Sequence, residues 1–442
     1  MSKLPFADAQ TGLQVLRALV KQRSLLAALE TMHAEVGDIF HVTLPRFDPA
    51  FVVGPEANRQ LLVTGRDQFN WRTESDAVTK LLGHGLLVED GDSHACLRHQ
   101  LEPALGKRQV AGQIGQMVAE TDRVLASWPA DGQRDMLVEM RKVALLILMQ
   151  TLFGVDFLPH LERLWQPILQ LLRYISPGLW IIWPNMPRPG YARAQQAVDD
   201  YLFGIIRERR AAGGTGDDML SRLVRQPEMS DKLIRDQLLT IMIAGHDTST
   251  ALLAWVWHLL GSHPAAMAQA VAEVEAVVGQ DMAGITAVSL PQLTYLDQVI
   301  KETLRLYPPI HVGNRLTNSP VTMQGYDIPA GMRVMYSIYL AHRHPDYWDE
   351  PELFRPERFG RSAEPENGYP VGKKRPSFIY LPFGGGPRNC IGAAFAQIEA
   401  KVVLARILQR FQLVHLPQEV HPHMGATLEP RPGVFMRVIS RQ

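Results

Sequence analysis

A ten-residue segment near the C-terminal end constrains this chain more than any other part of it. It reads Phe383-Gly384-Gly385-Gly386-Pro387-Arg388-Asn389-Cys390-Ile391-Gly392. The glycines permit a tight turn and expose backbone N–H groups. Directly afterwards, the periodicity predicts an amphipathic helix from about Ala393 to Phe411. Because the N-terminal end of a helix carries partial positive charge, this placement favours a thiolate at Cys390.

A haem fits these requirements. Its iron accepts a thiolate, its flat ring needs the clearance that Gly392 and the next alanines leave, and its propionates pair with a cation such as Arg388. Two other interpretations stay open on these residues alone. A glycine-rich loop before a helix also cradles phosphate, although no Gly-Lys-Ser/Thr ending is present here. A cysteine in a glycine turn can also be purely structural.

The segment closely resembles the haem-binding signature of the cytochrome P-450 family, the haem-thiolate monooxygenases, in its soluble bacterial type. The matching residues are Phe383, Gly384, Gly386, Arg388, Cys390 and Gly392. The resemblance implies that Cys390 is the axial ligand of the iron of haem b (iron protoporphyrin IX). It also implies that Phe383, Arg388 and Gly392 lie against the cofactor.

A second motif, Ala244-Gly245-His246-Asp247-Thr248-Ser249, lies within a mostly apolar stretch from Leu238 to Leu260. Burying an acid and an alcohol there costs free energy unless they are hydrogen-bonded or functional. The motif resembles the family's oxygen-activation motif, which implies that Thr248 positions hydrogen bonds to dioxygen and that Asp247 delivers protons. Ala244 and Gly245 would border the haem, and the missing side chain of Gly245 would leave room for a small ligand. The alternatives are a kinked structural helix and a membrane span.

Glu302-Thr303-Leu304-Arg305 places an acid and a base on one face of a helix. A solvated surface pair is the ordinary interpretation of such a spacing. The segment Pro356-Glu357-Arg358-Phe359 follows at the distance that the family shows. The resemblance therefore implies that Glu302, Arg305 and Arg358 form one buried ionic network with a structural role.

His94 and Arg98 are four residues apart and therefore share a helix face. The stretch resembles the family helix that holds a haem propionate, although Glu102-Pro103-Ala104-Leu105 ends in Leu where the family usually has Phe. Arg315 takes a position where the family places another propionate-binding arginine. The resemblance implies that these three residues and Arg388 neutralise the two propionates.

The chain has only two cysteines in 442 residues, so a disulfide framework is excluded and a reducing, cytoplasmic location is expected. We interpret Cys96 as a small buried residue, because its spacing from His94 and His99 does not match a zinc site. We interpret His342 and His344 as structural. The N-terminal residues resemble neither a signal peptide nor a membrane anchor.

Helical periodicity dominates from Glu56 to about Val278 and includes a long helix from Leu233 to Leu260. Short strands are expected at Phe40–Leu44, Phe51–Val53 and Val334–Tyr339. The length alone suggests about three domains, but the residues assigned to one cofactor are spread over much of the chain. The resemblance implies a single domain, residues 1–442, that is mainly α with small β-sheets (α+β) and buries the haem centrally.

By the same resemblance, the reaction inserts one oxygen atom from dioxygen into a hydrophobic organic substrate, as a hydroxylation or an epoxidation. The electrons would come from a separate ferredoxin or flavodoxin-type donor with its reductase, because no flavin or iron–sulfur module fits in the chain. Candidate docking residues on the Cys390 side are Lys107, Arg108, Lys373, Lys374 and Arg375. With Lys+Arg 45 and Asp+Glu 45, the chain lacks the basic excess of a nucleic-acid binder. A monomer is expected.

Two other functions stay open. One is a haem-thiolate peroxygenase or isomerase that needs no redox partner, and the other is a non-catalytic haem-binding sensor. The presence of Asp247 and Thr248 argues against both of them.

The substrate pocket is expected to be apolar, by similarity to the family's recognition regions. Its candidate contacts are Leu86, Leu87, Ile241, Ile310, Val312 and Thr427. The apolar stretch 178–184 is a candidate lid over a lipid-like or terpenoid substrate. Ordinary interior packing and a membrane contact are the alternatives for that stretch.

Overall fold

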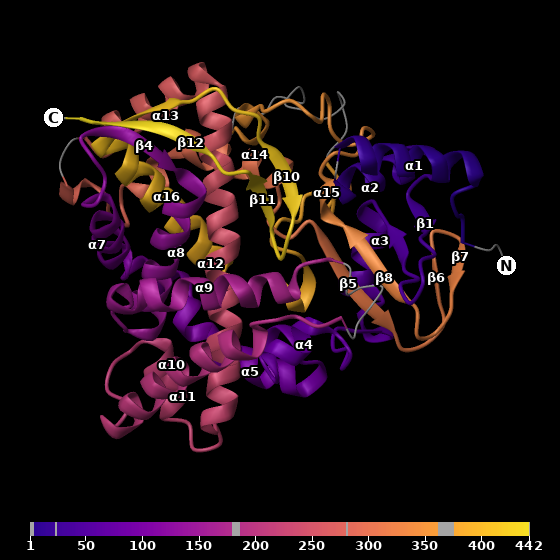
Figure 1. Ribbon diagram of the computed structural model, residues 1–442, viewed down its shortest axis with the longest axis horizontal. Helices are drawn as coiled ribbons and strands as arrows, with labels where there is room; N and C mark the ends of the chain where they lie inside the picture. Colours follow the sequence, from indigo (N-terminus) through magenta and orange to yellow (C-terminus); the bar gives the residue numbers. More distant parts are fainter. Residues whose placement is uncertain (1–3, 23, 179–185, 280–281, 361–374, 442) are drawn as a thin grey trace.

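The computed structural model describes residues 4–22, 24–178, 186–279, 282–360 and 375–441. Helices make up most of it, and the largest sheet lies to one side of the helical part (Figure 1). The expected mainly α architecture with small sheets is therefore confirmed. The helices are α1 (Ala9–Gln22), α2 (Leu25–Val36), α3 (Pro55–Arg59), α4 (Ala77–Leu82), α5 (Gly91–Leu105), α6 (Lys107–Ala111), α7 (Ile114–Leu125), α8 (Met136–Phe153), α9 (Leu158–Ile175), α10 (Tyr191–Ala211), α11 (Met219–Val224), α12 (Asp231–Ser262), α13 (Pro264–Val277), α14 (Thr294–Leu306), α15 (Ile338–Ala341) and α16 (Ala393–Arg410).

Four small sheets complete the described fold. A five-stranded sheet has the order β1-β2-β8-β5-β3, in which only β2 and β8 run parallel. A three-stranded sheet has the order β4-β12-β9, and β6–β7 and β10–β11 are hairpins. The strands are β1 (Ile39–His41), β2 (Ala50–Val52), β3 (Phe69–Asn70), β4 (Asp131–Asp135), β5 (Val312–Thr317), β6 (Val321–Met323), β7 (Tyr326–Ile328), β8 (Arg333–Ser337), β9 (Phe411–His415), β10 (His421–Met424), β11 (Leu428–Arg431) and β12 (Phe435–Ser440).

Helix α12 runs through the middle of the helical part (Figure 1). The Ser230 hydroxyl caps it by accepting a hydrogen bond from the Leu233 N–H at 3.2 Å. It packs against α8, α10, α14 and α16, so apolar residues are buried on all of its sides. The long helix expected from Leu233 to Leu260 is confirmed. Among the described residues, no single helix is long and apolar enough to cross a membrane, and only α8 and α9, bent by 114°, pass that test as a pair.

The five-stranded sheet buries both of its faces. Phe40 and Phe51 stack on each other with ring centroids 5.2 Å apart and pack with side chains of α2. Ile39 and Val52 point to the other face, as the period of two along a strand requires. The strand expected at Val334–Tyr339 ends earlier than the pattern suggested. The Ser337 hydroxyl accepts a hydrogen bond from the Leu340 N–H and begins α15, so Tyr339 is helical.

Candidate active site

The Cys390 segment forms a closed turn in front of α16. The Cys390 N–H donates to the Phe383 carbonyl at 2.8 Å. Gly384 and Gly386 have φ angles of 67° and 66°, and a Cβ at Gly386 would lie 2.2 Å from the Leu62 carbonyl oxygen. Other residues are therefore strained at these positions. The turn places Cys390 three residues before the first residue of α16.

The surroundings of the Cys390 sulfur act on its ionisation in opposite directions. Burial by the surrounding residues raises the pKa of the thiol, whereas the Gly392 N–H and the Arg98 guanidinium lower it. The Cys390 side chain is nevertheless exposed, so the protein encloses the sulfur only in part. Phe383, Gly392 and the first alanines of α16 are also only partly buried. The net effect raises the pKa of the thiol, so these surroundings alone favour its neutral form, and a bound metal ion would be what deprotonates it.

Basic side chains from three distant segments gather beside this turn. The Arg98 guanidinium donates to the Asn389 carbonyl at 2.8 Å and to the Asn389 Oδ1 at 3.0 Å, which ties α5 to the Cys390 turn. Arg315 of β5 stacks on the Trp71 ring at 3.8 Å, and Arg388 faces the same ring at 5.2 Å. Burial lowers the pKa of Arg388, and the charges of Arg315 and Arg98 help to lower it, so the three guanidiniums form one group, with Arg315 and Arg388 against the Trp71 ring.

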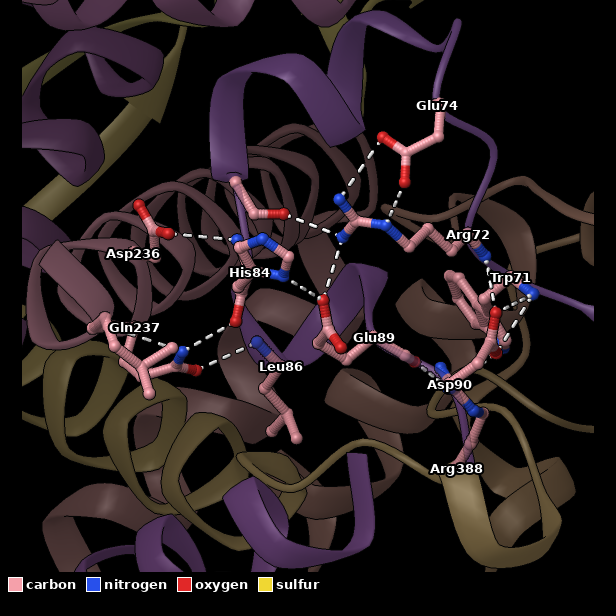
Figure 2. Close-up of polar contacts among 12 residues, drawn as sticks. Trp71, Arg72, Glu74, His84, Leu86, Glu89, Asp90, Asp236, Gln237 and Arg388 are labelled. Atoms are coloured by element: carbon pink, nitrogen blue, oxygen red, sulfur yellow. Dashed lines mark hydrogen bonds and ion pairs between the residues drawn. The ribbon is translucent and has the colours of Figure 1, made fainter. Parts of the chain in front are cut away.

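The charge of this group is only partly neutralised by protein. Arg388 pairs with Asp90 at 2.9 Å and also donates to the Glu89 carbonyl, as Figure 2 shows. Burial, followed by the charges of Arg388 and Arg98, lowers the pKa of His94 to about 4, so His94 is neutral at physiological pH. Arg98 also lies 3.9 Å from Glu102, so the three guanidiniums carry one positive charge more than Asp90 and Glu102 together balance. A ligand with carboxylates would balance it.

The acid and the alcohol of α12 point to different surroundings. The Thr248 hydroxyl donates to the Ala244 carbonyl at 2.7 Å, and Ala244, Gly245 and Thr248 are the partly exposed members of this stretch. Asp247 is 2% exposed and accepts hydrogen bonds from Arg141 at 3.1 Å and from Thr427 at 2.8 Å. Arg141 also contacts Glu429. The Thr427 hydroxyl is thus engaged with Asp247.

Gly245 serves helix packing in this structure. A Cβ at this position would lie 2.5 Å from the Leu148 Cδ1 atom of α8. We expected the missing side chain of Gly245 to leave room for a small ligand. On the side to which a Cβ would point, this is wrong, because Leu148 fills that space. Helix α12 is also continuous from Asp231 to Ser262, although Thr248 bonds back to the preceding turn.

Glu302, Arg305 and Arg358 lie together in the interior. Arg305 makes a two-pronged ion pair with Glu302, with both N–O distances 2.8 Å. The Arg358 Nε donates to the same carboxylate at 3.2 Å. The remaining donors of Arg305 bond to the carbonyls of His342, Pro351 and Leu353. Glu302 and Arg305 are each 0% exposed, so these hydrogen bonds compensate for their removal from water.

The candidate substrate contacts occupy varied surroundings. Leu86 and Ile241 are buried, Leu87 and Val312 are partly buried, and Ile310 is 42% exposed. A cavity of about 570 Å³ lies where the end of α9 meets the β10–β11 hairpin. Residues that line it include Leu172, Tyr174, Met186, Gly425 and Ala426, together with Arg141, Asp247 and Glu429.

The structure bears differently on the predictions for Cys96, for the docking residues and for the proposed lid. Cys96 is exposed on α5, so its interpretation as a buried residue is wrong, because this position faces away from the core side formed by Leu97 and Leu101. Lys107 and Arg108 are exposed, but Arg375 is partly buried and stacks on Trp348 at 4.0 Å. Lys373 and Lys374 lie outside the described residues, as does nearly all of the proposed lid at 178–184.

Two buried polar groups, Arg141 and Glu399, were not predicted from the sequence. Arg141 lies between Glu139 and Lys142 near the start of α8, so nothing in the local sequence separates it from a solvated charge. Glu399 of α16 is 1% exposed and accepts a hydrogen bond from Ser249 of α12 at 2.5 Å. Burial raises the pKa of Glu399 to about 8, so its carboxyl group is mostly protonated at neutral pH.

A separate cluster of titratable side chains lies where α2 meets the segment that follows α15. His33, Asp38 and His344 place their ligand atoms within 4.8 Å of one another. The Asp346 N–H donates to the Nδ1 atom of His344, and the Nε2 atom of His344 lies 3.1 Å from Asp38. Neutral His344 therefore carries its proton on Nε2 and donates it to Asp38. The cluster is a hydrogen-bonded group, in agreement with the structural interpretation of His344.

These residues suit haem b. A thiol before a helix offers an iron ligand, a group of three arginines with excess positive charge matches two propionates, and partly exposed small residues interrupt the burial of α12. Haem b bound at such a site supplies the binding and reductive activation of dioxygen. The fold and the site together define a haem-thiolate enzyme.

Comparison with known proteins identifies the family. The model of the cytochrome P450 family matches residues 11–436. Cyclooctat-9-en-7-ol 5-monooxygenase of Streptomyces melanosporofaciens is 32% identical over 401 residues, 86% of this chain and 83% of that protein. Cyclooctatin synthase of the same organism is 30% identical over 95% of this chain and 90% of that protein. A putative cytochrome P450 139 of Mycobacterium tuberculosis is 31% identical over 88% of this chain and 91% of that protein.

The solved structures agree with this. A retinoic acid-bound cyanobacterial CYP120A1 superimposes with a TM-score of 0.84 at 27% sequence identity, and the match covers 100% of both chains. The chain therefore belongs to the cytochrome P450 family and is a haem b-dependent monooxygenase.

Proposed function

We propose that this monooxygenase oxidises an apolar cyclic terpenoid alcohol. Two similar proteins support this, because one acts on cyclooctat-9-en-7-ol, an unsaturated alcohol by its name, and the other is named cyclooctatin synthase. The cavity between α9 and the β10–β11 hairpin agrees with such a substrate. Leu172, Tyr174, Met186 and Ala426 give the cavity apolar lining, and six charged side chains around it are available to orient a hydroxyl.

The proposed reaction consumes one substrate, one dioxygen, two electrons and two protons, and it releases a hydroxylated product and water. Thr248 contributes a hydroxyl from the partly exposed face of α12, where a rotation of its side chain would exchange the Ala244 carbonyl for another acceptor. Asp247 provides a carboxylate next to Thr248 and is among the residues that line the cavity, with Arg141 and Glu429. Protons would reach Thr248 through Asp247.

Two electrons must be supplied by a partner. We propose a ferredoxin or flavodoxin-type donor that docks near Lys107 and Arg108, which are exposed just after α5. Arg98 of α5 is hydrogen-bonded to the Cys390 turn, so a protein that binds just after α5 would lie near the segment that carries the proposed iron ligand. An acidic partner would suit the two cations.

We also propose that residues 1–442 act as one catalytic unit and as a cytoplasmic monomer. The proposed site residues come from α5, β5, α12 and the Cys390 turn, which are contributed by segments far apart in the sequence. The absence of a disulfide framework, with only Cys96 and Cys390 present, suits a reducing compartment.

The deciding experiment is turnover of the purified holoenzyme with a surrogate ferredoxin, its reductase and NADPH. A panel of farnesol, geranylgeraniol and cyclic diterpene alcohols serves as substrate, with isotope-labelled dioxygen. We expect one labelled oxygen atom in the product and a spin-state shift on binding. Product that forms with peroxide but not with the reductase system would contradict the proposed monooxygenase cycle. Turnover of fatty acids in preference to every terpenoid alcohol would contradict the substrate class.

A further inference from the structure

The segment from Trp71 to Asp90 connects β3 to α5 through α4, and it carries Leu86 and Leu87. Connecting segments usually lie at the surface and move more than the elements that they join. Here, however, side chains of α12 form hydrogen bonds with backbone N–H and C=O groups of this segment. Figure 2 shows these contacts around His84 and Leu86.

Gln237 of α12 makes the central contact. Its Oε1 atom accepts a hydrogen bond from the Leu86 N–H at 2.9 Å, and its Nε2 atom donates to the His84 carbonyl at 2.8 Å. One amide thus bonds to residues i and i+2 of the loop, as a residue of a neighbouring parallel strand would. Gln237 is 0% exposed, so both bonds are shielded from water.

Adjacent groups hold the same turn. The Asp236 carboxylate accepts from the His84 N–H at 2.9 Å. A Cβ at Gly83 would lie 2.4 Å from Asp236 Oδ2, and a Cβ at Gly85 would lie 1.8 Å from Thr240 Oγ1. The absence of side chains at both glycines therefore lets the loop backbone lie directly on α12.

A second set of contacts closes the loop from its other side. Arg72 donates to the Gly83 carbonyl at 2.9 Å and to Glu89 at 2.8 Å. Asp90 accepts from the N–H groups of Trp71 and Arg72 and pairs with Arg388 of the Cys390 turn. The loop is therefore bonded both to α12 and to the segment that carries the proposed iron ligand.

The position of Gln237 on α12 gives this contact a functional meaning. Residues 237, 241, 244 and 248 recur at helical spacing and lie along one face of α12. Gln237 precedes Ala244 by about 10 Å along the helix axis. It therefore holds the loop on the same helix face that carries Thr248.

We propose that Gln237 is a positioning residue that fixes Leu86 and Leu87 as a rigid wall of the substrate space and thereby determines where the substrate is oxidised. This inference rests on the proposed function only for the identity of the substrate.

The test compares Gln237→Met with Gln113→Met in the holoenzyme. Gln113 is a matched control, because it is also buried and its Nε2 atom donates to the Thr151 carbonyl at 2.8 Å. A carbon monoxide difference spectrum first establishes equal haem loading. We expect hydrogen exchange of the amides of residues 84–88 to accelerate by about tenfold or more in Gln237→Met, because two shielded hydrogen bonds are lost. Unchanged exchange, or equal acceleration in Gln113→Met, would overturn the proposal.

A second measurement tests the wall itself. The dissociation constant of imidazole measures access to the haem. 4-Phenylimidazole carries an additional phenyl ring, so its dissociation constant also depends on the space next to the haem that must hold this ring. We expect Gln237→Met to change the ratio of their dissociation constants by about fourfold, the equivalent of one buried methylene group. An unchanged ratio would show that Leu86 and Leu87 do not line this space.

Neither measurement uses the natural substrate, so both remain decisive if no terpenoid alcohol is oxidised. If Gln237→Met does not take up haem, Gln237→Glu replaces it. That variant keeps an acceptor for the Leu86 N–H and loses the donor to the His84 carbonyl. With a substrate in hand, the ratio of product isomers should change in Gln237→Met and stay constant in Gln113→Met, and the reverse pattern would contradict the proposal.

Discussion

Arg141 of α8 holds Asp247 of α12 in a buried ion pair, with 3.1 Å between the Arg141 Nη2 and the Asp247 Oδ1. Thr427 donates to the other carboxylate oxygen, so each oxygen is engaged with a partner other than Thr248. If Asp247 delivers protons, its side chain must exchange these partners during each turnover.

Replacing Asp247 by Asn should slow reductase-driven turnover by about 100-fold, because the proton donor is lost while the shape is kept. Peroxide-driven product formation should fall much less, since peroxide brings its own protons and electrons. The two rates are measured on the same preparation, and Asp92→Asn, on the exposed start of α5, serves as the control. An equal loss in both assays would point to a folding defect.

Cys390→Ser should abolish the red-shifted band of the reduced carbon monoxide complex, because a hydroxyl does not replace a thiolate as iron ligand. Cys96→Ser should leave the band unchanged, because Cys96 is exposed on α5. A band that survives in Cys390→Ser would remove Cys390 from the proposed role.

Glu302→Gln should destabilise the protein by about 3–5 kcal/mol, because it leaves Arg305 and Arg358 buried without their counter-charge. Chemical denaturation of the haem-free and haem-loaded forms measures this. Glu357→Gln is the matched control, because Glu357 lies next to Arg358 but is exposed. A loss below about 1 kcal/mol, typical of surface pairs, would mean that the network carries little stability.

Because Glu399 is buried, we expect the stability of the folded protein to depend on pH. Burial raises its pKa from 4.5 to about 8, so the folded protein binds a proton that the unfolded chain releases. Stability should therefore fall as the pH rises between these two values and level off above them. In Glu399→Gln this slope should be smaller, whereas Glu35→Gln, at an exposed position, should match the parent. Parallel curves for Glu399→Gln and the parent would refute the raised pKa.

Lys107→Glu together with Arg108→Glu should slow electron transfer from an acidic donor by about tenfold at low ionic strength, with a smaller effect at high salt. Stopped-flow reduction of the carbon monoxide-saturated enzyme gives the rate. Arg17→Glu together with Lys21→Glu, both exposed on α1 beside the five-stranded sheet, makes an equivalent charge change elsewhere. Equal rates in all variants would exclude this surface as the docking site.

Local sequence determined the features whose partners are close along the chain. The turn that carries Cys390 follows from the φ angles that Gly384 and Gly386 adopt, and a glycine signal of this kind is visible in the sequence. Glu302 and Arg305 pair across one helical turn, and a spacing of three residues is enough to predict that they share a face.

Tertiary structure decided the contacts between distant segments. Arg141 meets Asp247 and Gln237 meets Leu86 because helices α8 and α12 and the loop before α5 pack in particular directions. Nothing in the neighbourhood of Gln237 distinguishes it from a solvated glutamine, and Cys96 was misplaced because the apolar pattern of α5 does not say which face meets the core. The sequence by itself thus predicted Cys390 as the iron ligand and identified the family, to which the chain belongs. Packing alone decided which buried side chains restrain the proposed site, because those contacts depend on the relative orientation of whole helices.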